Sequence, residues 1–538
     1  MPRGLCRDAF LFVIPLPMRT RVLVGSLLVV HAGLVGSVAL AQSVERLWAT
    51  NCMKCHGEEG QGGGAGTKTL LTDELMAAKL DRVFFDVIKQ GKADAGMEAF
   101  GETLEDKQIW GLVNYIRELQ ASANRKRVGS ISKKLDEGGV CKTQHESFTI
   151  ERIITDGLDT PWAMDWLPSK PNEPQHMLVT NRSGEVKVWT LANSSKPQDG
   201  ELSDEIKDIP KSVEAGQGGM MEVTVHPDYA SNGWVYLGYT KALDGNKTMT
   251  TIVRGKLERD GDEWTWKDQQ TIFEAKPEHA VASGLHFGVR IVFSEPLTGD
   301  NKGKRYLFFS IGERGRADHA QDLARPNGKV HRVFDDGTIP SDNPFLEAKD
   351  AYPSIYSYGH RNPQGLVLDL AGNLWDTEHG PRGGDEFNLV LKGRNYGWPV
   401  VSFGINYNGS VFKTPWPDTE GEDAVKLNIM MPTDRWLPSI GACGMDVVRP
   451  GPSDQGWGEA FPKWKGDILA GGLSGQNVDR IRVVPASDEP SGFRVVEREE
   501  IVHGIGRVRD VAVAPDGSVY VALNGPDHII RLTPVATK

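Results

Sequence analysis

The sequence has too little of several things that would place it in a familiar class. Only 5 of its 538 residues are cysteine, too few for a scaffold held together by disulfides. Its 61 Lys and Arg are outnumbered by 72 Asp and Glu, and this net charge of -11 argues against a general nucleic-acid binder. Its 61 Gly and 31 Pro follow no three-residue period, which excludes a collagen-like chain. A hydrophobic fraction of 39% predicts an ordinary packed core.

Only one stretch of the chain is apolar enough to approach the length of a membrane span, and it lies near the N-terminus. Arg19 and Arg21 precede an uncharged run over residues 22–40. The run ends in Ala39-Leu40-Ala41, the small-x-small pattern that signal peptidase recognises. A membrane span is the alternative, but the cleavage pattern favours a signal peptide over residues 1–41. The sequence therefore predicts a periplasmic protein without a membrane span after signal cleavage.

A short cysteine motif follows the signal, in the string Cys52-Met53-Lys54-Cys55-His56. The spacing Cys-x-x-Cys-His is typical of covalent haem c attachment. Two thiols one helical turn apart can add to the two vinyl groups of a haem, and the next residue brings an imidazole to the iron. A redox dithiol or half of a zinc site is the alternative, which the adjacent histidine and the export signal disfavour.

Helical periodicity around this motif predicts a small all-α cytochrome c domain over residues 43–122. The expected helices cover 43–51, 72–90 and a segment that starts at Thr103. Met97 lies between the second and the third, in a segment that resembles the Met-Pro-x-Phe loop of class I cytochromes c. Because His/Met ligation is the cytochrome c arrangement for electron transfer, Met97 is the predicted sixth iron ligand. A methionine that only fills the core is the alternative.

Beyond a polar segment over 123–150, predicted as a linker, helical periodicity disappears. A strand–turn–strand unit then recurs six times, with starts at residues 163, 222, 289, 365, 445 and 511. Six β-units of about 60–80 residues predict a six-bladed β-propeller over residues 151–536. A β-sandwich is the alternative, and this spacing fits it poorly.

Polar strings gather between the repeats. They are Gly216-Gln217-Gly218-Gly219, His286-Phe287-Gly288-Val289-Arg290, Gly312-Glu313-Arg314-Gly315-Arg316, Gly359-His360-Arg361-Asn362-Pro363-Gln364-Gly365, Glu378-His379-Gly380-Pro381-Arg382-Gly383-Gly384-Asp385-Glu386, Asn395-Tyr396-Gly397-Trp398-Pro399 and Arg507-Val508-Arg509-Asp510. Loops at equivalent positions of a propeller converge on its central channel, so these residues would surround one pocket. Such a pocket suits a planar polyanion with a candidate base beside it.

At these strings the chain resembles the glucose/sorbosone dehydrogenase family, over about residues 155–533. The strings that begin at Gly359 and at Glu378 are long and specific to it. The resemblance implies a six-bladed propeller quinoprotein that oxidises sugars with pyrroloquinoline quinone (PQQ) and calcium.

The resemblance also implies roles for individual residues. His286 would be the general base, and Glu313 the carboxylate that orients it. The residues that would hold the quinone are Gln217, Arg361, Asn362, Arg507 and Arg509. The main-chain oxygens of Gly380 and Pro381 would bind the calcium of the cofactor, and Glu386 and Tyr396 would lie near a further structural calcium.

Two departures from the glucose-oxidising branch favour the aldose branch with broad specificity. Ser474 stands where that branch has a lysine, and Leu285 replaces a carboxylate just before the base. The sequence thus predicts an aldose dehydrogenase that passes electrons to its own haem and on to a downstream acceptor. A catalytically inactive propeller fused to an electron-transfer cytochrome is the first alternative, and a cytochrome cd₁-type reductase is the second.

Two cysteines are left once haem takes Cys52 and Cys55 and the signal removes Cys6. In an oxidising compartment these two, Cys141 and Cys443, are predicted to form a disulfide.

Overall fold

The computed structural model describes residues 43–63, 69–76, 80–128, 138–170, 173–191, 199–412, 428–449 and 460–535. The predicted signal peptide lies outside the described residues. Among the described helices, none combines the length and the apolar character needed to cross a membrane. Residues 41–538 form one compact unit by their contacts.

The N-terminal part is helical and packs around its own apolar core. Its elements are α1 (Val44–Asn51), α2 (Met53–His56), α3 (Asp73–Met76), α4 (Asp81–Gln90), η1 (Ala93–Ala95) and α5 (Asp106–Val128). Apolar residues at helical spacing, among them Leu47, Phe84, Ile88 and Ile109, are buried together. Because these stripes face one another, the short helices form a core that none of them could form alone.

The helix bounds differ from the predicted ones in two places. The predicted 72–90 helix is two helices, α3 and α4. The helix predicted from Thr103 begins at Asp106 instead, because the Thr103 hydroxyl donates to the carbonyl of Phe100 and the side chain of Gln108 accepts from the amide of Glu105. Those contacts form a turn that precedes the helix.

The segment predicted as a linker, residues 123–150, contains more regular structure than its polar composition suggests. Helix α5 continues to Val128, with three basic residues in its last turn, where the helix dipole favours cations. Strand β1 (Cys141–Lys142) then pairs with β2 (Ser147–Ile154).

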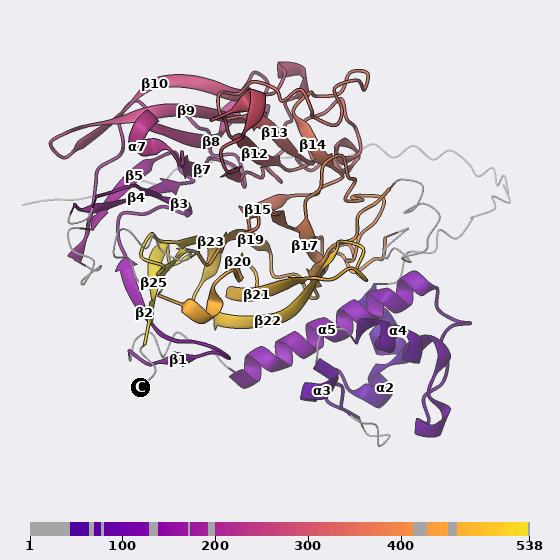
Figure 1. The fold of residues 1–538 in the computed structure, drawn as a ribbon. Helices are drawn as coiled ribbons and strands as arrows, with labels where there is room; N and C mark the ends of the chain where they lie inside the picture. The colour runs from indigo at the N-terminus through magenta and orange to yellow at the C-terminus, as the bar shows by residue number, and fades with distance from the viewer. Residues whose placement is uncertain are drawn as a thin grey trace, which may run out of the picture. The chain divides into compact units, whose positions relative to one another are not determined.

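The rest of the chain forms six antiparallel sheets that follow one another around a ring (Figure 1). Blade 1 contains β3 (Pro161–Leu167), β4 (Gln175–Asn181), β5 (Val186–Leu191) and β6 (Glu201–Leu202), and blade 2 contains β7 (Met220–Val225), β8 (Trp234–Ala242), β9 (Thr248–Asp260) and β10 (Glu263–Glu274). Blade 3 contains β11 (Ile291–Phe293), β12 (Tyr306–Ile311), β13 (Lys329–Phe334) and β14 (Ile355–Tyr358), and blade 4 contains β15 (Pro363–Leu368), β16 (Leu374–Glu378), β17 (Asp385–Leu389) and β18 (Asp434–Trp436). Blade 5 contains β19 (Ala442–Val447), β20 (Ile468–Gly472), β21 (Asn477–Pro485) and β22 (Phe493–His503).

The sixth blade joins the two ends of the propeller. It combines β23 (Arg507–Val513), β24 (Val519–Asn524) and β25 (His528–Pro534) with β2 and β1 from the other end of the propeller sequence. Strand β2 pairs with β25, with Ile150 opposite Leu532. This closure leaves few open strand edges, and it confirms the predicted six-bladed β-propeller.

Buried hydroxyl groups tie neighbouring blades together. Thr180 donates to the carbonyl of Met221 at 2.7 Å, from the second strand of blade 1 to the first strand of blade 2. Ser310 bonds Pro363 in the same way between blades 3 and 4, at 3.0 Å. These bonds fix the inner strands of adjacent blades, which carry the polar strings at their ends.

The predicted disulfide between Cys141 and Cys443 is wrong. Both residues are buried thiols without a disulfide. Cys141 lies on β1 of the closing sheet, whereas Cys443 lies on β19, where its thiol donates to the carbonyl of Val508 at 2.8 Å. The separation along the chain gave no information on this placement.

Candidate active site

A cavity of about 430 Å³ lies where loops from several blades converge. Five of the predicted site residues line it: Gln217, Gly380, Pro381, Arg507 and Arg509. Ser474 lines it as well. The polar strings therefore come together at one hollow, as the repeat pattern predicts.

His286 lies in the loop before β11, next to this cavity. Its backbone adopts a positive φ of 51°, which is uncommon for a residue other than glycine and is found at functional sites more than elsewhere. Its amide donates to Oε1 of Gln217 at 2.9 Å, so the base candidate is fixed to a cavity-lining residue. Its Nδ1 makes a short hydrogen bond with the carboxylate of Glu313.

The surroundings of His286 favour a neutral imidazole with a defined tautomer. Burial lowers the pKa of His286 and the Arg361 guanidinium lowers it further, while the hydrogen bond with Glu313 opposes both. The buried carboxylate of Glu313 can only accept at Nδ1, so Nδ1 carries the proton and Nε2 is left with its lone pair. A neutral imidazole held in this way is equipped to take a proton at Nε2.

Arg361 and Asn362 connect the His286 loop with the Gly380 loop. Arg361 donates from Nη1 to the carbonyl of Gly380 at 2.8 Å, and its guanidinium lies over the ring of Trp398, 5.2 Å from the ring centroid. Asn362 is fully buried, and its Oδ1 accepts from the amide of Gly288 at 3.2 Å. Both predicted residues therefore lie between the base and the predicted calcium ligands.

Arg509 and Arg507 come from the start of β23. Arg509 donates to Gln364 at 2.9 Å and to Asn524 at 3.1 Å, and lies 4.0 Å over the ring of Trp162. Burial lowers the pKa of Arg509 to about 10. In the described part of the chain no carboxylate forms an ion pair with Arg361, Arg507 or Arg509. Three guanidinium groups without a carboxylate partner favour an anionic ligand.

The Gly380–Pro381 turn is held from below by Asp385, a residue that sequence reasoning did not single out. Asp385 Oδ1 accepts from the amide of Gly380 at 2.8 Å, and Oδ2 accepts from the amides of Ile440 and Ala442 at 3.0 and 2.9 Å. The turn lines the cavity, where the Gly380 carbonyl accepts from Arg361 at 2.8 Å and the Pro381 carbonyl accepts from Ser439 at 3.3 Å. Carbonyl oxygens are the hard ligands that calcium prefers.

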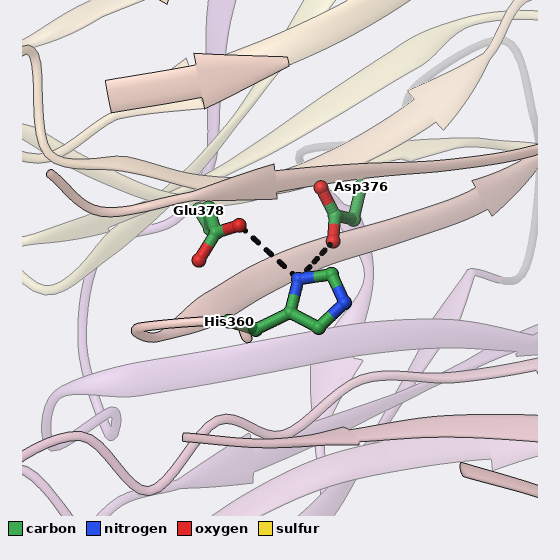
Figure 2. A group of neighbouring side chains, drawn as sticks. All are labelled: His360, Asp376 and Glu378. Atoms are coloured by element: carbon green, nitrogen blue, oxygen red, sulfur yellow. Dashed lines mark hydrogen bonds and ion pairs between the residues drawn. The ribbon is translucent and has the colours of Figure 1, made fainter. Parts of the chain in front are cut away.

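A second polar cluster lies inside blade 4, and Figure 2 shows three of its residues. His360 Nδ1 lies 3.1 Å from Glu378 Oε1 and 3.3 Å from Asp376 Oδ2. Glu378 and Glu386 both accept from Asn388, each at 3.2 Å. The His360, Asp376 and Glu378 donor atoms lie close enough together to hold one metal ion.

This blade 4 cluster contains the other two predicted metal residues. Burial, together with the charge of Glu378, raises the pKa of Asp376 and of Glu386 well above their usual values. Tyr396 stacks on the His360 ring with 4.4 Å between centroids, while its hydroxyl donates to the carbonyl of Leu389. Glu386 and Tyr396 therefore belong to the blade 4 cluster, which shares no residue with the Gly380–Pro381 turn.

The haem motif occupies α2 of the helical domain. The amides of Cys55 and His56 both donate to the carbonyl of Cys52, which puts the two thiols and the imidazole on one short turn. Burial raises the pKa of the Cys52 thiol to about 12, and Cys55 adds to this effect. Met97 lies between η1 and α5 and packs against the same apolar core as Cys52. Partly buried apolar side chains beside a Cys-x-x-Cys-His turn fit a covalently attached haem.

Sequence reasoning missed Arg290 and Gln364, although both lie in the quoted strings. Arg290 is buried and pairs with Glu222 and Asp510, both at 3.0 Å. It also donates to the carbonyls of Gln364 and Arg509 at 2.8 and 3.0 Å, so it fixes the backbone beneath the cavity. The pattern of charges within the strings could not predict these contacts, because the partners of Arg290 come from three other blades, 2, 4 and 6.

The two departures from the glucose-oxidising branch fall on exposed positions. Leu285 exposes 47% of its surface. Ser474 donates to the carbonyl of Ser439 at 3.4 Å at the edge of the cavity. Neither is part of the His286–Glu313 pair.

Comparison with known proteins assigns the propeller to a protein family. The sequence pattern described as "Glucose / Sorbosone dehydrogenase" matches residues 158–531. The chain belongs to the glucose/sorbosone dehydrogenase family. A second pattern, described as "Cytochrome C oxidase, cbb3-type, subunit III", matches residues 39–116, so the N-terminal region of this family member carries a cytochrome c domain. Both parts of the predicted resemblance are confirmed.

Several sugar dehydrogenases are similar to this glucose/sorbosone dehydrogenase family member. Aldose sugar dehydrogenase YliI of Escherichia coli is 36% identical over 385 residues, which cover 71% of this chain and 92% of the relative. Quinoprotein glucose dehydrogenase B of Acinetobacter calcoaceticus is 30% identical over 290 residues, which cover 48% of this chain and 54% of the relative. The crystal structure of the soluble aldose sugar dehydrogenase of Escherichia coli in its apo form superposes with a TM-score of 0.58 at 32% identity, covering 72% of this chain and 100% of that one.

Proposed function

We propose that this protein is a periplasmic, PQQ- and calcium-dependent aldose dehydrogenase that passes electrons to a covalent haem c in the same chain. The observation that carries the proposal is the buried His286–Glu313 pair beside a cavity lined by guanidinium groups. Membership in a family with sugar dehydrogenase relatives supports the reaction class. The Acinetobacter relative is named quinoprotein glucose dehydrogenase B, and this name supports a quinone cofactor.

His286 acts as the general base in this proposal. Its Nε2 takes the proton of the substrate hydroxyl group as hydride leaves the carbon that bears this group. Glu313 keeps Nδ1 protonated and stabilises the imidazolium that forms, which is the part a buried carboxylate plays beside a catalytic histidine. The hydrogen bond from the His286 amide to Gln217 keeps the imidazole at the edge of the cavity.

The residues around the cavity suit the quinone and its calcium. Arg361, Arg507 and Arg509 would bind the carboxylates of PQQ, while Gln217 and Asn362 would bind polar groups of the ring. The carbonyl oxygens of Gly380 and Pro381 would hold calcium. When bound, PQQ would supply the acceptor for the hydride and its two electrons, and the calcium would polarise the quinone carbonyl.

A further cation would bind in the blade 4 cluster, near Glu386 and Tyr396. Three buried carboxyl groups, those of Asp376, Glu378 and Glu386, lie together here, and a divalent cation would favour their charged forms over the neutral forms that burial favours. A bound cation would raise the stability of blade 4 by mass action.

The cytochrome c domain supplies the electron acceptor. Cys52 and Cys55 would hold the haem by thioether bonds, with His56 and Met97 as its axial ligands. A downstream cytochrome or quinone-pool component would then oxidise the haem. The predicted signal peptide supports a periplasmic location, where such attachment takes place. The His286–Glu313 geometry speaks against the alternative of an inactive propeller.

Reconstitution tests this function. The full-length protein is loaded with PQQ and calcium and assayed for reduction of an artificial dye with a panel of aldoses and alcohols. We expect aldose-dependent dye reduction that needs both PQQ and calcium, with weaker activity on simple alcohols. Protein incubated with PQQ and a chelator is the matched control. Absence of dye reduction with every aldose in the loaded protein would contradict the proposed function.

A further inference from the structure

The loop that carries the predicted calcium ligands also binds the cytochrome c domain. Arg382, directly after Pro381, donates from Nε and Nη2 to the two carboxylate oxygens of Glu118 on α5, at 2.8 and 2.6 Å. Its Nη1 donates to Glu45 on α1 at 2.5 Å. A planar guanidinium that binds one carboxylate with two parallel bonds and a second carboxylate with its remaining nitrogen is held in a single orientation.

Backbone groups close the same contact on both sides of Arg382. The side chain of Asn114, on α5, donates to the carbonyl of Arg382 at 2.9 Å. The amide of Val44, at the start of α1, donates to the carbonyl of Gly409 at 3.0 Å. A Cβ atom added at Gly383 would collide with the Asn114 side chain. The Asn114 side chain therefore lies so close to Gly383 that no larger residue fits there, and such close packing is a property of a specific interface.

The charges at this contact are only partly exposed. The side chains of Arg382 and Glu118 expose 22% and 21% of their surface. The hydrogen bond with Glu118 raises the pKa of Arg382, in spite of the burial that opposes it. A second pair, Arg435 with Asp81 at 3.2 Å, lies between blade 4 and α4. Ion pairs at this exposure contribute more to orientation and partner choice than to affinity.

An aromatic column connects this contact with the predicted haem ligand. Tyr115 lies one helical turn before Glu118 on α5, and burial together with the charges of Glu45 and Glu118 raises its pKa. Its ring meets the ring of Trp48 edge-on, with 5.8 Å between centroids. The Trp48 ring lies 6.2 Å from the ring of His56. The three rings thus run from Tyr115, one helical turn before the Arg382 partner Glu118, to the imidazole expected to bind iron.

We propose that Arg382 is a positioning residue that docks the cytochrome c domain on the loop of the quinone site, and that electrons leave the cavity past Tyr115 and Trp48 toward His56. The inference rests on the proposed function, because it gives that function its internal electron route. Gly380 and Pro381, the predicted calcium ligands, directly precede Arg382 in the loop, so one short loop serves both the cofactor and the acceptor domain.

Oxidation of the aldose at its hydroxyl carbon releases two electrons and two protons. The haem iron takes one electron at a time and changes from iron(III) to iron(II). An external one-electron acceptor must therefore reoxidise the haem between the two transfers. One proton is the hydroxyl proton taken by His286, the other is carried by the hydride, and both finally leave to solvent.

The first test uses charge reversal in the full-length protein loaded with PQQ, calcium and haem. For each variant, sugar-dependent haem reduction is measured by rapid mixing and divided by sugar-dependent dye reduction. We expect Glu118→Lys to lower this ratio by about tenfold or more, because it places a cation against Arg382. Asp86→Lys is the matched control: it reverses a carboxylate of the same domain whose partner, among the described residues, is Arg82 on its own helix, and the ratio should not change.

The second test asks whether the charges act as a pair. Combining Glu118→Lys with Arg382→Glu restores the attraction with reversed signs, so the ratio should recover most of the loss. Hydrogen exchange followed by mass spectrometry gives a readout that does not depend on activity. Segments 380–384 and 405–411 should exchange faster in Glu118→Lys and return toward the original rate in the combined variant.

The outcomes separate this inference from the proposed function. If the unaltered protein reduces no dye with any aldose, the proposed function fails, and the exchange data alone then test the docking of Arg382. If dye reduction is present, an unchanged ratio and unchanged exchange in Glu118→Lys would overturn the inference. A lowered ratio that the combined variant does not restore would overturn the pairing of Arg382 with Glu118.

Discussion

In the cytochrome c domain, three of the four predicted haem contacts lie within five consecutive residues, whereas the propeller draws its site from residues 217 to 509. The haem motif sits on the single short helix α2. The cavity residues come from the ends of strands in different blades. A site formed by one turn can be predicted from a short motif, and it is lost when that turn is disrupted. A site built from a closed ring depends on contacts between blades, and Arg290 with its partners Glu222 and Asp510 illustrates them.

The largest effect that would sharpen this contrast is expected at the base. His286→Ala should lower sugar-dependent dye reduction by roughly 10²–10⁴, the usual share of a general base. The haem should still be reducible by dithionite, because His286 belongs to the propeller alone. Dye assays and haem spectra of the same preparation measure both effects. Retention of full dye reduction would remove His286 from the mechanism.

A smaller effect is expected at the carboxylate that orients the base. Glu313→Gln should lower the rate by about tenfold, since a neutral amide cannot stabilise the imidazolium. Glu313 raises the pKa of His286 against burial, so its removal should lower that pKa further. The rate rises with pH as His286 loses its proton, and its acidic limb should therefore move to lower pH. A pH–rate profile whose acidic limb stays in place would show that Glu313 does not act through His286.

The cytochrome c domain should respond to its own ligands without any response from the propeller. Met97→Ala should remove the weak sulfur-to-iron absorption band of the oxidised haem, while dye reduction by the propeller stays the same. An optical spectrum of the oxidised protein measures the band. A band that persists would assign the sixth position to another ligand.

The smallest effect concerns the ties between blades. Thr180→Val removes the bond to the carbonyl of Met221 and the one from the amide of Ala163, and should lower the free energy of unfolding by about 1–3 kcal/mol. Urea unfolding followed by tryptophan fluorescence measures this change, with the haem spectrum as the internal reference for the other domain. An unchanged midpoint would mean that the tie is not needed for blade packing.

Periodicity in the sequence was sufficient for both folds, because α-helical and strand–turn–strand patterns are local properties. The six predicted units coincide with the first two strands of the six blades. Local patterns gave poorer results where tertiary contacts decide. Helix α5 extends to Val128, beyond the apolar positions from which it was predicted. The Cys443 thiol donates to the carbonyl of Val508 in a neighbouring blade and forms no bond with a second thiol.

In the candidate site, too, residues in contiguous motifs could be predicted, whereas roles that depend on distant partners could not. The strings that hold His286, Glu313 and Arg361 could be found because they are contiguous. Asp385 and Arg382 lie in one of those strings too, yet their partners, at Ile440 and Glu118, are distant in the chain. Only the fold shows that Asp385 supports the turn from the propeller side while Arg382 contacts the cytochrome c domain.

We expect a coupling within one chain, in which sugar oxidation in the propeller reduces the haem of the cytochrome c domain. It is tested most directly by adding an aldose to the anaerobic, fully loaded protein and following the haem spectrum without any added acceptor. We expect the bands of reduced haem, formed only when PQQ and calcium are present and lost in His286→Ala. Haem that stays oxidised while the same preparation reduces a dye with the same aldose would contradict it.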